Sequence, residues 1–510
     1  MKFLKTIILY LFSYQAMQSQ EFVPCYSDLI TTATYAQGGT GAYKNEIIWL
    51  TWGGKDAENP FGKPNQELQS GAKSYASIFL GEGKYLCLEA ELIKIGNAVL
   101  ESYRPGDYPG DSMDDWYNIG GNDANNKLIC GIINREQGAR THFKVRIKSS
   151  INGNPVRLRG LIVGDAESTD PYEYIRCKAD GVWSILDVKK NTSRGAYQIR
   201  KDPTNKVIQF GTGNDTNTAA LAALKFNPSA FKVGSLEAEI EVSTKGSGKQ
   251  AIAIGVLTPG IDLGDAPESY GDPLHTIEKL NLSADNTNYT NTFTGTLANG
   301  NWQYTNRVTN INTIAYTPAV IIPESPYFLG SVKPNSNTGP VHSLLANTDG
   351  LDINQPNEED AWPSDRKRIS YNSTYYQIGN ELRIEIPYSS QTNAYITGWI
   401  DFDGDGKFGE NRTENISLNT IGDIVSFNNS HFEFAAVKIL PATNGRAQIS
   451  WIIPSKIKYK TTYVRLRIGD QLHEISSPIS NAIEGEVEDH RIIVLGPAST
   501  NPNIQNTTSK

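Results

Sequence analysis

Short segments in which apolar and charged residues alternate strictly recur along the chain of 510 residues. Successive side chains of a β-strand point to opposite faces, so this pattern predicts strands with one buried face. The clearest examples are residues 143–148, 236–242, 382–386 and 464–468. Clusters of Gly, Asn, Pro, Asp and Ser, which favour turns, separate such segments. We therefore expect an all-β chain built from two β-sandwich domains.

One segment does not alternate. Residues 218–224 read Thr-Ala-Ala-Leu-Ala-Ala-Leu. Because Ala and Leu have high helix propensity, we expect a short helix here, the one convincing helix in the sequence.

The N-terminus has the pattern of a secretory signal peptide. A short basic start at residues 1–5 precedes an apolar stretch at 6–12, and small or polar residues follow at 15–20. The apolar stretch is shorter than the roughly 20 residues that span a bilayer, and no later segment is apolar enough to do so. We expect a secreted protein, extracellular or at the cell surface, with no transmembrane segment in the mature chain.

Charge and cysteine content restrict the partners and the cross-links. The net charge of −8 argues against nucleic acid as a partner, because binding phosphates requires clustered Lys and Arg. All four cysteines lie in the first 177 residues, at Cys25, Cys87, Cys130 and Cys177. In an exported protein they form one or two disulfides or remain buried thiols, and no CxxC pair indicates a zinc site.

A domain boundary is expected near residues 257–260. Before it, residues 251–256 predict a closing strand, and after it residues 262–267 are polar and rich in turn formers. The absence of cysteines beyond this point supports the division. The expected organisation is a signal peptide at 1–20, domains at 21–258 and 261–496, and a disordered tail at 497–510.

A carboxylate-rich loop carries the sharpest chemical signal. Three acids at alternate positions and a glycine follow a predicted strand: Asp401, Asp403, Asp405 and Gly406. Calcium prefers six to eight oxygen ligands, and a sharp turn brings several to one point. The loop resembles the first half of an EF-hand loop, although Arg412 stands at its twelfth position, which leaves Glu410 or Glu414 to supply a late carboxylate. A metal-free hairpin is the alternative, but facing carboxylates repel one another unless neutralised, so we predict structural Ca²⁺.

The second predicted domain resembles the GEVED family, which is named for its closing pentapeptide. The motifs that carry the resemblance occur in the family's order at 262–271, 327–331, 358–360, 399–406, 464–467 and 485–489. The resemblance implies an exported bacterial protein, often with adhesion modules beside this domain. It also implies a step after the acidic loop that residues 414–416 resemble, which makes Glu414 the expected fourth calcium ligand.

The first predicted domain resembles the lectin-like non-repetitive domain of CshA-type fibrillar surface adhesins. The motifs are residues 35–45, 47–53, 160–168 and 173–175, and the resemblance covers roughly 25–258. It implies a β-sandwich that binds ligands on host or neighbouring cells, including matrix glycoproteins. The long repeat array that builds a fibril in those adhesins is absent from this sequence, so fibril formation does not carry over.

A long loop within this domain is the candidate ligand-binding site. Its aromatic and acidic residues are Asp107, Tyr108, Asp111, Asp114, Asp115 and Trp116. Aromatic planes combined with acidic hydrogen-bond acceptors suit the recognition of sugars or proteins. The alternative is a solvated acidic loop whose aromatic residues are fixed in the core. Asp165 and Glu167 share a strand face and either face a ligand or stabilise a turn.

No pattern of catalytic residues stands out. The six histidines lack metal-ligand spacing, with His142 and His490 expected to be structural, and HExxH, GxSxG and P-loop motifs are absent. We therefore predict that the protein is not an enzyme but an adhesin-like protein that binds an extracellular glycoprotein or glycan non-covalently. A secreted carbohydrate-binding protein and a structural spacer without a ligand are the alternatives, and a cryptic glycoside hydrolase has the least support.

Overall fold

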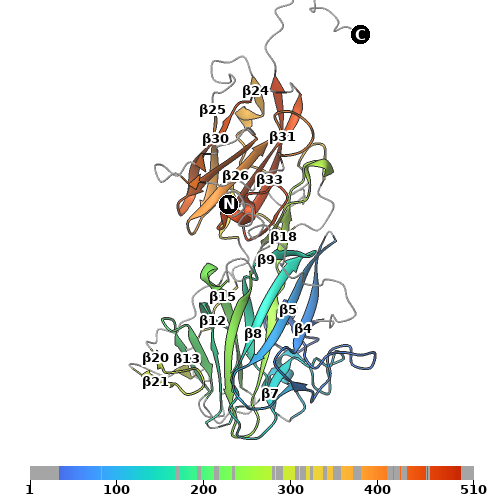
Figure 1. The fold of residues 1–510 in the computed structure, drawn as a ribbon, viewed down its shortest axis with the longest axis vertical. Helices are drawn as coiled ribbons and strands as arrows, with labels where there is room; N and C mark the ends of the chain where they lie inside the picture. Colours follow the sequence, from blue (N-terminus) through green and yellow to red (C-terminus); the bar gives the residue numbers. More distant parts are fainter. Residues whose placement is uncertain are drawn as a thin grey trace, which may run out of the picture. The chain divides into compact units, whose positions relative to one another are not determined.

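The chain forms two compact units (Figure 1). Unit 1 comprises residues 1–258 and 279–322, and unit 2 comprises residues 259–278 and 323–510. No helix in the part of the chain that is described is long and apolar enough to cross a membrane. The computed structural model describes residues 34–81, 83–108, 110–167, 169–170, 172–191, 197–211, 218–231, 236–277, 282, 291–304, 309–310, 317–321, 325–336, 342–347, 358–370, 381–409, 417–418, 425–426, 433–454, 457 and 460–495.

Two large antiparallel sheets form a sandwich in unit 1. Nine strands make up the first sheet, with β1 and β2 attached to β17. In spatial order its strands are β12 (Gly181–Lys189), β15 (Ala219–Phe226), β10 (Gly160–Asp165), β17 (Ala251–Leu257), β7 (Gly131–Asn134), β6 (Leu100–Tyr103) and β3 (Glu67–Leu68), followed by the attached β2 (Ile47–Trp49) and β1 (Thr34–Tyr35).

The second sheet of unit 1 contains the alternating segments predicted at 143–148 and 236–242, which lie in adjacent strands. Apolar residues such as Val145 and Ile240 are paired and buried on one face, while Lys144 and Glu239 form an ion pair of 3.1 Å on the other. The strands are β22 (Thr309–Asn310), β13 (Gln198–Asp202), β14 (Val207–Phe210), β11 (Tyr174–Lys178), β16 (Ala238–Lys245), β8 (Phe143–Ile151), β5 (Lys84–Lys94) and β4 (Lys73–Gly81), with β9 (Asn154–Val156) beside β8.

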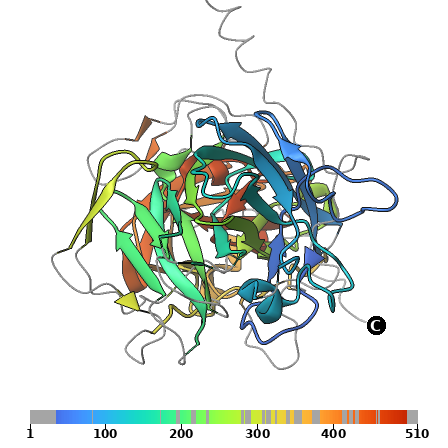
Figure 2. The same cartoon turned by 90° about the horizontal axis from the view of Figure 1, so that it is seen from below.

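The first sheet is covered on one face by α2 (Ser112–Tyr117), the short dark-teal helix in Figure 2. Bulky side chains of α2, among them Met113 and Trp116, pack in one buried cluster with small residues of the sheet. Gly164 shows how close the packing is, since an added Cβ would lie 2.6 Å from Leu221 and 3.1 Å from the Sδ of Met113. The small residues of this face are Ala219, Ala223, Ala251 and Ala253.

The prediction of a helix at residues 218–224 is wrong, because residues 219–224 lie in β15, an interior strand of the first sheet. The strand pairs with β10 on one side and β12 on the other, and its first six residues are buried. Helix propensities differ by only tenths of a kcal/mol per residue, and a short, continuous apolar run fits a buried strand as well as a helix. The small alanine side chains leave space for the bulky side chains of α2 to pack on this face.

A hairpin of β20 (Asn291–Thr294) and β21 (Asn301–Tyr304) also belongs to unit 1. The Nε1 of Trp302 donates to the Oε1 of Gln209 at 2.8 Å, and the guanidinium of Arg176 lies over the rings of both Tyr174 and Phe293. The expected domain limits of 21–258 and 261–496 place this hairpin in the second domain. The hairpin is a two-stranded sheet of its own, and its place in unit 1 depends on contacts with residues far away in the sequence.

Unit 2 is also a sandwich. A five-stranded sheet packs against a three-stranded sheet around one apolar core, and both segments predicted as strands, at 382–386 and 464–468, contribute to it. The five strands are β24 (Arg368–Ser370), β33 (Glu486–Leu495), β31 (Thr461–Gly469), β26 (Ala394–Ile400) and β29 (Phe434–Ile439), and the three are β23 (Tyr327–Leu329), β25 (Glu381–Ser390) and β30 (Ala442–Ile452).

Smaller elements complete both units. Unit 2 also has a third sheet, of three short strands, and two further short strands form a separate pair. These elements are β18 (Gly260–Leu263), β19 (Leu274–Ile277), β32 (Asn481–Ile483), α3 (Leu472–Ile475), β27 (Ser417–Leu418), β28 (Val425–Ser426) and the 3₁₀ turns Pro228–Ala230, Glu268–Tyr270 and Ser364–Arg366. Of the cysteines, Cys87 is disulfide-bonded, Cys130 and Cys177 are buried thiols, and Cys25 lies outside the described residues.

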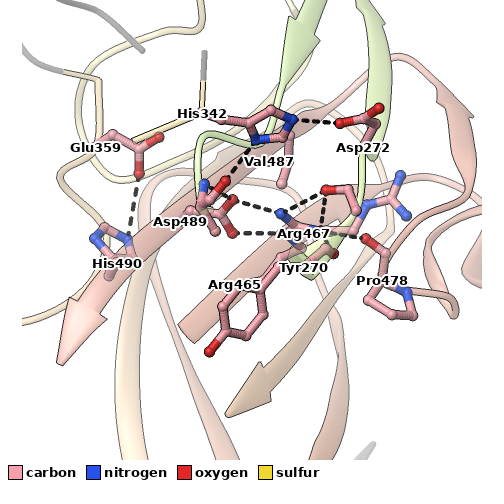
Figure 3. Close-up of polar contacts among 12 residues, drawn as sticks. Tyr270, Asp272, His342, Glu359, Arg465, Arg467, Pro478, Val487, Asp489 and His490 are labelled. Carbon is pink, nitrogen blue, oxygen red and sulfur yellow. Dashed lines mark hydrogen bonds and ion pairs between the residues drawn. The ribbon is translucent and has the colours of Figure 1, made fainter. Parts of the chain in front are cut away.

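A buried ion pair joins β31 to β33 on the face away from the core (Figure 3). Arg465 and Asp489 are both 0% exposed, and the guanidinium donates to both carboxylate oxygens at 2.8 and 2.7 Å. Arg465 also donates to the carbonyl oxygens of Tyr270 and Pro478 at 3.0 and 2.9 Å. The pair thereby fastens two loops to the sheet.

Asp165 is a buried carboxylate at the end of β10 in unit 1. It accepts hydrogen bonds from the hydroxyls of Tyr197 and Thr169 at 2.5 and 2.7 Å and from the amide of Gln250 at 2.9 Å. Burial outweighs these donors and raises the pKa of Asp165 to about 7. Of the two roles considered for this residue, the turn-stabilising one fits its burial.

We predict that Arg465→Met lowers the free energy of unfolding by about 3–5 kcal/mol, because it leaves Asp489 charged and buried without its partner. Arg446→Met is the matched control, since Arg446 pairs with Glu385 at 2.8 Å with both side chains more than half exposed, and an exposed pair contributes at most about 1 kcal/mol. Denaturant unfolding of the full chain measures both variants. Equal losses would contradict the assigned role of the buried pair.

We also predict that unit 1 loses stability as the pH rises from about 4 to about 7. The folded state holds the proton on Asp165 up to about pH 7, whereas the unfolded chain releases it near pH 4, so folding takes up a proton in this interval. The loss is roughly 4 kcal/mol for a shift of about three pKa units.

Thermal unfolding between pH 4 and pH 8 measures this slope. Asp165→Asn should flatten it, whereas Asp56→Asn should not, because a hydrogen bond from Lys63 lowers the pKa of Asp56 to about 2 and keeps it ionised throughout. A slope that Asp165→Asn leaves unchanged would assign the effect to other acids.

Candidate functional site

The loop predicted to bind a ligand in unit 1 is braced by Asp111. This carboxylate is 2% exposed, and it accepts hydrogen bonds from the hydroxyl of Tyr103 and, at 2.8 Å, from the backbone N–H of Gly106. Gly106 has a φ of 94°, which favours glycine. Asp111 therefore closes the turn that begins the loop and does not face solvent.

Asp114 closes the other end of the loop. One of its oxygens accepts hydrogen bonds from the backbone N–H groups of Gly120 and Gly121 at 2.8 and 2.5 Å. A Cβ on Gly121 would lie 1.7 Å from the other oxygen, so only glycine fits there. The helix α2 lies between the two turns that Asp111 and Asp114 close, and its C-cap residue Asn118 has the left-handed conformation.

The predicted ligand residues separate into a buried group and an exposed group. Trp116 is 3% exposed and its ring packs on Tyr117 at 4.9 Å, so with Asp111 it serves the core in this structure. Asp107, Tyr108 and Asp115 are exposed. Trp116 is thus fixed in the core, as the alternative of a solvated loop with core-bound aromatic residues expects.

Tyr108 presents an aromatic face at the surface. The residue is 49% exposed, and its ring stacks on that of Tyr103 at 6.3 Å and an interplanar angle of 25°. Burial and the nearby charge of Asp111 raise the pKa of Glu167 to about 10, so this carboxyl is protonated and uncharged near pH 7. An aromatic ring beside hydrogen-bonding acids on a braced loop can bind a polyhydroxylated or polar ligand.

The acidic loop of unit 2 starts with a fully buried carboxylate. Asp401 is 0% exposed; its Oδ1 accepts the N–H of Gly404 at 2.5 Å, and its Oδ2 accepts the N–H of Gly406 at 3.2 Å and the hydroxyl of Tyr270 at 2.6 Å. Asp403 accepts the N–H of Asp405 at 3.0 Å. The loop is therefore a series of tight turns around Asp401.

The carboxylates that come together differ from the predicted set. Oxygens of Asp401, Asp403 and Glu433 lie within 4.8 Å of one another, whereas the exposed Asp405 accepts the N–H of Lys407 at 2.9 Å. Glu414 lies outside the described residues. Burial, together with the charges of Asp401 and Asp403, raises the pKa of Glu433 to about 7.

Glu433 was missed because it is far from the loop in sequence. It directly precedes β29, which pairs with β26, and the N–H of Ile400 donates to the Glu433 carbonyl at 3.0 Å. The Glu433 carboxylate also accepts the N–H groups of Phe402 and Gly409 at 3.1 and 2.8 Å. Sheet register, rather than spacing within the loop, is the signal that brings it to the site.

The closing pentapeptide places its acids on alternate faces of β33. Asp489 faces Arg465, whereas Glu486 and Glu488 share the other face with His490. Burial raises the pKa of both Glu486 and Glu488. Oxygens of Glu488 and Glu359 and a nitrogen of His490 form a second group within 4.8 Å. Buried acidic clusters in unit 2 can therefore hold a metal ion at two places.

Two of the solved structures that match the chain are remote likenesses. The N-terminal domain of the Streptococcus gordonii adhesin Sgo0707 has 6% identity and a TM-score of 0.29, with 95% of this chain and 100% of that chain covered. Escherichia coli α2-macroglobulin activated by porcine elastase has 8% identity and a TM-score of 0.14, with 91% and 50% covered. No match is found among curated proteins.

Comparison with family models gives a match to one segment of each unit. Residues 45–257 match the surface adhesin CshA non-repetitive domain 2, and residues 395–493 match the GEVED domain. Both segments agree with the motifs recognised in the sequence, and the first lies within the sandwich of unit 1. Residues 45–257 are therefore similar to the surface adhesin CshA non-repetitive domain 2, and residues 395–493 are similar to the GEVED domain.

Proposed function

We propose that this protein is a secreted adhesin that binds a glycoprotein or glycan on host or neighbouring cells, without covalent chemistry. The match of residues 45–257 to a surface adhesin family carries the proposal. The signal-peptide pattern at residues 1–20 and the acidic net charge are consistent with an extracellular protein. Unit 1 supplies the binding surface, and unit 2 supports it.

The binding surface is the exposed side of the loop that contains α2. Tyr108 supplies an aromatic face, and the exposed Asp107 and Asp115 of the same loop supply hydrogen-bond acceptors. Asp111 and Asp114 hold the loop through backbone N–H groups, so the loop loses little conformational entropy when a ligand binds. The rigid base distinguishes this loop from a merely solvated one.

Unit 2 includes a calcium site in this proposal. Asp401, Asp403 and Glu433 supply carboxylate oxygens that already lie close together, and an oxygen-only set suits Ca²⁺. Neutralisation by the ion would remove the repulsion among three acids, one of them fully buried. Glu433 replaces Asp405 as the third carboxylate, and Glu414 remains a proposed ligand.

We predict that Tyr108→Ala weakens binding to the ligand that the full chain selects from a glycan and matrix-protein array by about 10-fold. A central aromatic contact contributes more than 1 kcal/mol to such an interface, and half of this side chain is exposed. Biolayer interferometry with the wild type and the variant measures the change.

Tyr172→Ala is the matched control, because Tyr172 is also an exposed tyrosine of unit 1, with 75% of its surface accessible, and lies outside the loop. It should bind like the wild type. Equal losses in both variants, or none in Tyr108→Ala, would exclude the loop as the binding surface. An array on which the wild type binds nothing would favour the spacer function instead.

We predict that Ca²⁺ at about 100 times its Kd raises the melting temperature of unit 2 in the full chain by roughly 5–10 °C. Glu433→Gln should abolish the increase, because it removes a carboxylate that faces Asp401 and Asp403. Asp405→Asn should retain most of it, since the Asp405 side chain turns to the N–H of Lys407. Differential scanning calorimetry with and without Ca²⁺ measures all three proteins.

The opposite pattern, in which Asp405→Asn abolishes the increase and Glu433→Gln retains it, would restore the ligand set expected from the loop spacing. If Ca²⁺ left the melting temperature of the wild type unchanged, the calcium site itself would be excluded.

A further inference from the structure

Two separate sequence motifs meet at His490 in unit 2. The Nε2 of His490 lies 2.8 Å from the Oε2 of Glu488 and 4.0 Å from the Oε2 of Glu359. Figure 3 shows Glu359 and His490 facing each other. Glu359 belongs to the segment before β24, and Glu488 belongs to the closing pentapeptide, so two motifs without an assigned role supply one cluster.

The cluster lies on the core side of the five-stranded sheet. Register places His490 opposite Val464 and, across β31, in the same row as Ile400, and both of these side chains belong to the core. The ring of Trp362 lies 6.3 Å from that of His490. The side chains of Glu359, Glu488 and His490 are only 3%, 1% and 5% exposed.

One buried carboxylate oxygen of the cluster has no hydrogen-bond partner among the described residues. The Oε1 of Glu488 is buried and accepts no hydrogen bond from any described residue, although its Oε2 accepts the N–H of Ala361 at 2.9 Å as well as facing His490. No Lys or Arg in the described part of the chain pairs with Glu488. An unsatisfied oxygen on a buried carboxylate is costly unless a cation or a proton compensates it.

We propose that Glu359, Glu488 and His490 bind one Zn²⁺ ion. An imidazole nitrogen with two carboxylates suits zinc, whereas calcium takes oxygen ligands. Ligands of a tetrahedral zinc ion stand about 3.3 Å apart for bonds of about 2.0–2.1 Å, and the distances of 2.8 and 4.0 Å bracket that value. The ion with two carboxylates and a neutral imidazole leaves no net charge in the core.

The role of this ion is structural. It ties β33 to the segment that precedes β24, while the hydrogen bond from Ala361 orients the carboxylate of Glu488. The three protein ligands are buried, so the ion is held between the two sheets rather than presented to a substrate. The site is independent of the proposed ligand surface in unit 1 and of the proposed calcium loop.

The test uses the full chain, loaded with Zn²⁺ and dialysed against metal-free buffer. We expect about one zinc per chain by elemental mass spectrometry and a higher melting temperature of unit 2. Glu359→Gln should weaken zinc binding by at least about 100-fold, since even the loss of a residue that only orients a ligand costs 10–100-fold. Without metal the same variant should melt no lower than the wild type, because it removes one of the buried negative charges.

Two control variants define the site. His342→Gln should keep the zinc, because His342 pairs with Asp272 elsewhere in unit 2, and Asp403→Asn should keep it because that residue belongs to the acidic loop. Co²⁺ bound to the wild type should give the intense visible absorption of a four-coordinate site, which needs no substitution. Zinc that is not retained by the wild type, or is retained equally by Glu359→Gln, overturns the proposal.

Discussion

The five-stranded sheet of unit 2 is covered on both faces, and the buried ion pair of Arg465 and Asp489 shows what this requires of its charged residues. One face of β33 closes on the apolar core, and the other carries a fully buried ion pair whose remaining donors reach loop carbonyls. A buried guanidinium is tolerated only when all its donors are satisfied. Arg467 obeys the same rule, donating to the carbonyls of Ser477 and Ser480 at 2.6 and 2.8 Å.

The first sheet of unit 1 is also covered on both faces, but there small side chains rather than a buried ion pair allow the second covering layer to pack. One face is covered by α2, and the strands beneath carry several alanines and Gly164 on that face, where Met113 and Trp116 pack closely. The loop that positions α2 is itself held by Asp111 and Asp114 through backbone N–H groups. The exposed Tyr108 therefore stands on a base that the core fixes.

Sequence periodicity predicted the strands well because it reports one buried face. The segments at 143–148 and 464–468 are both strands. Only the first has a partly exposed charged face, because Arg465 and Arg467 of the second are fully buried. The same reasoning failed for 218–224, where both faces are buried and the pattern has no period. It also missed Glu433, since only the pairing of β26 with β29 brings that carboxylate to Asp401.

The two acidic clusters of unit 2 lie near one row of the five-stranded sheet, and the register explains why. Ile400, Val464 and His490 occupy one row across β26, β31 and β33, and Asp401 follows directly after Ile400 where β26 ends. Neighbouring strands stand about 4.8 Å apart, so the two clusters are separated by roughly two strand spacings. The cluster in the loop is partly exposed, and all its ligand atoms are carboxylate oxygens. The second cluster faces the core, and the imidazole of His490 adds a nitrogen to its two carboxylates. Buried carboxylates at such close range repel one another unless bound cations or protons neutralise them. The stability of the sheet should therefore depend on the pH and on the concentration of metal ions.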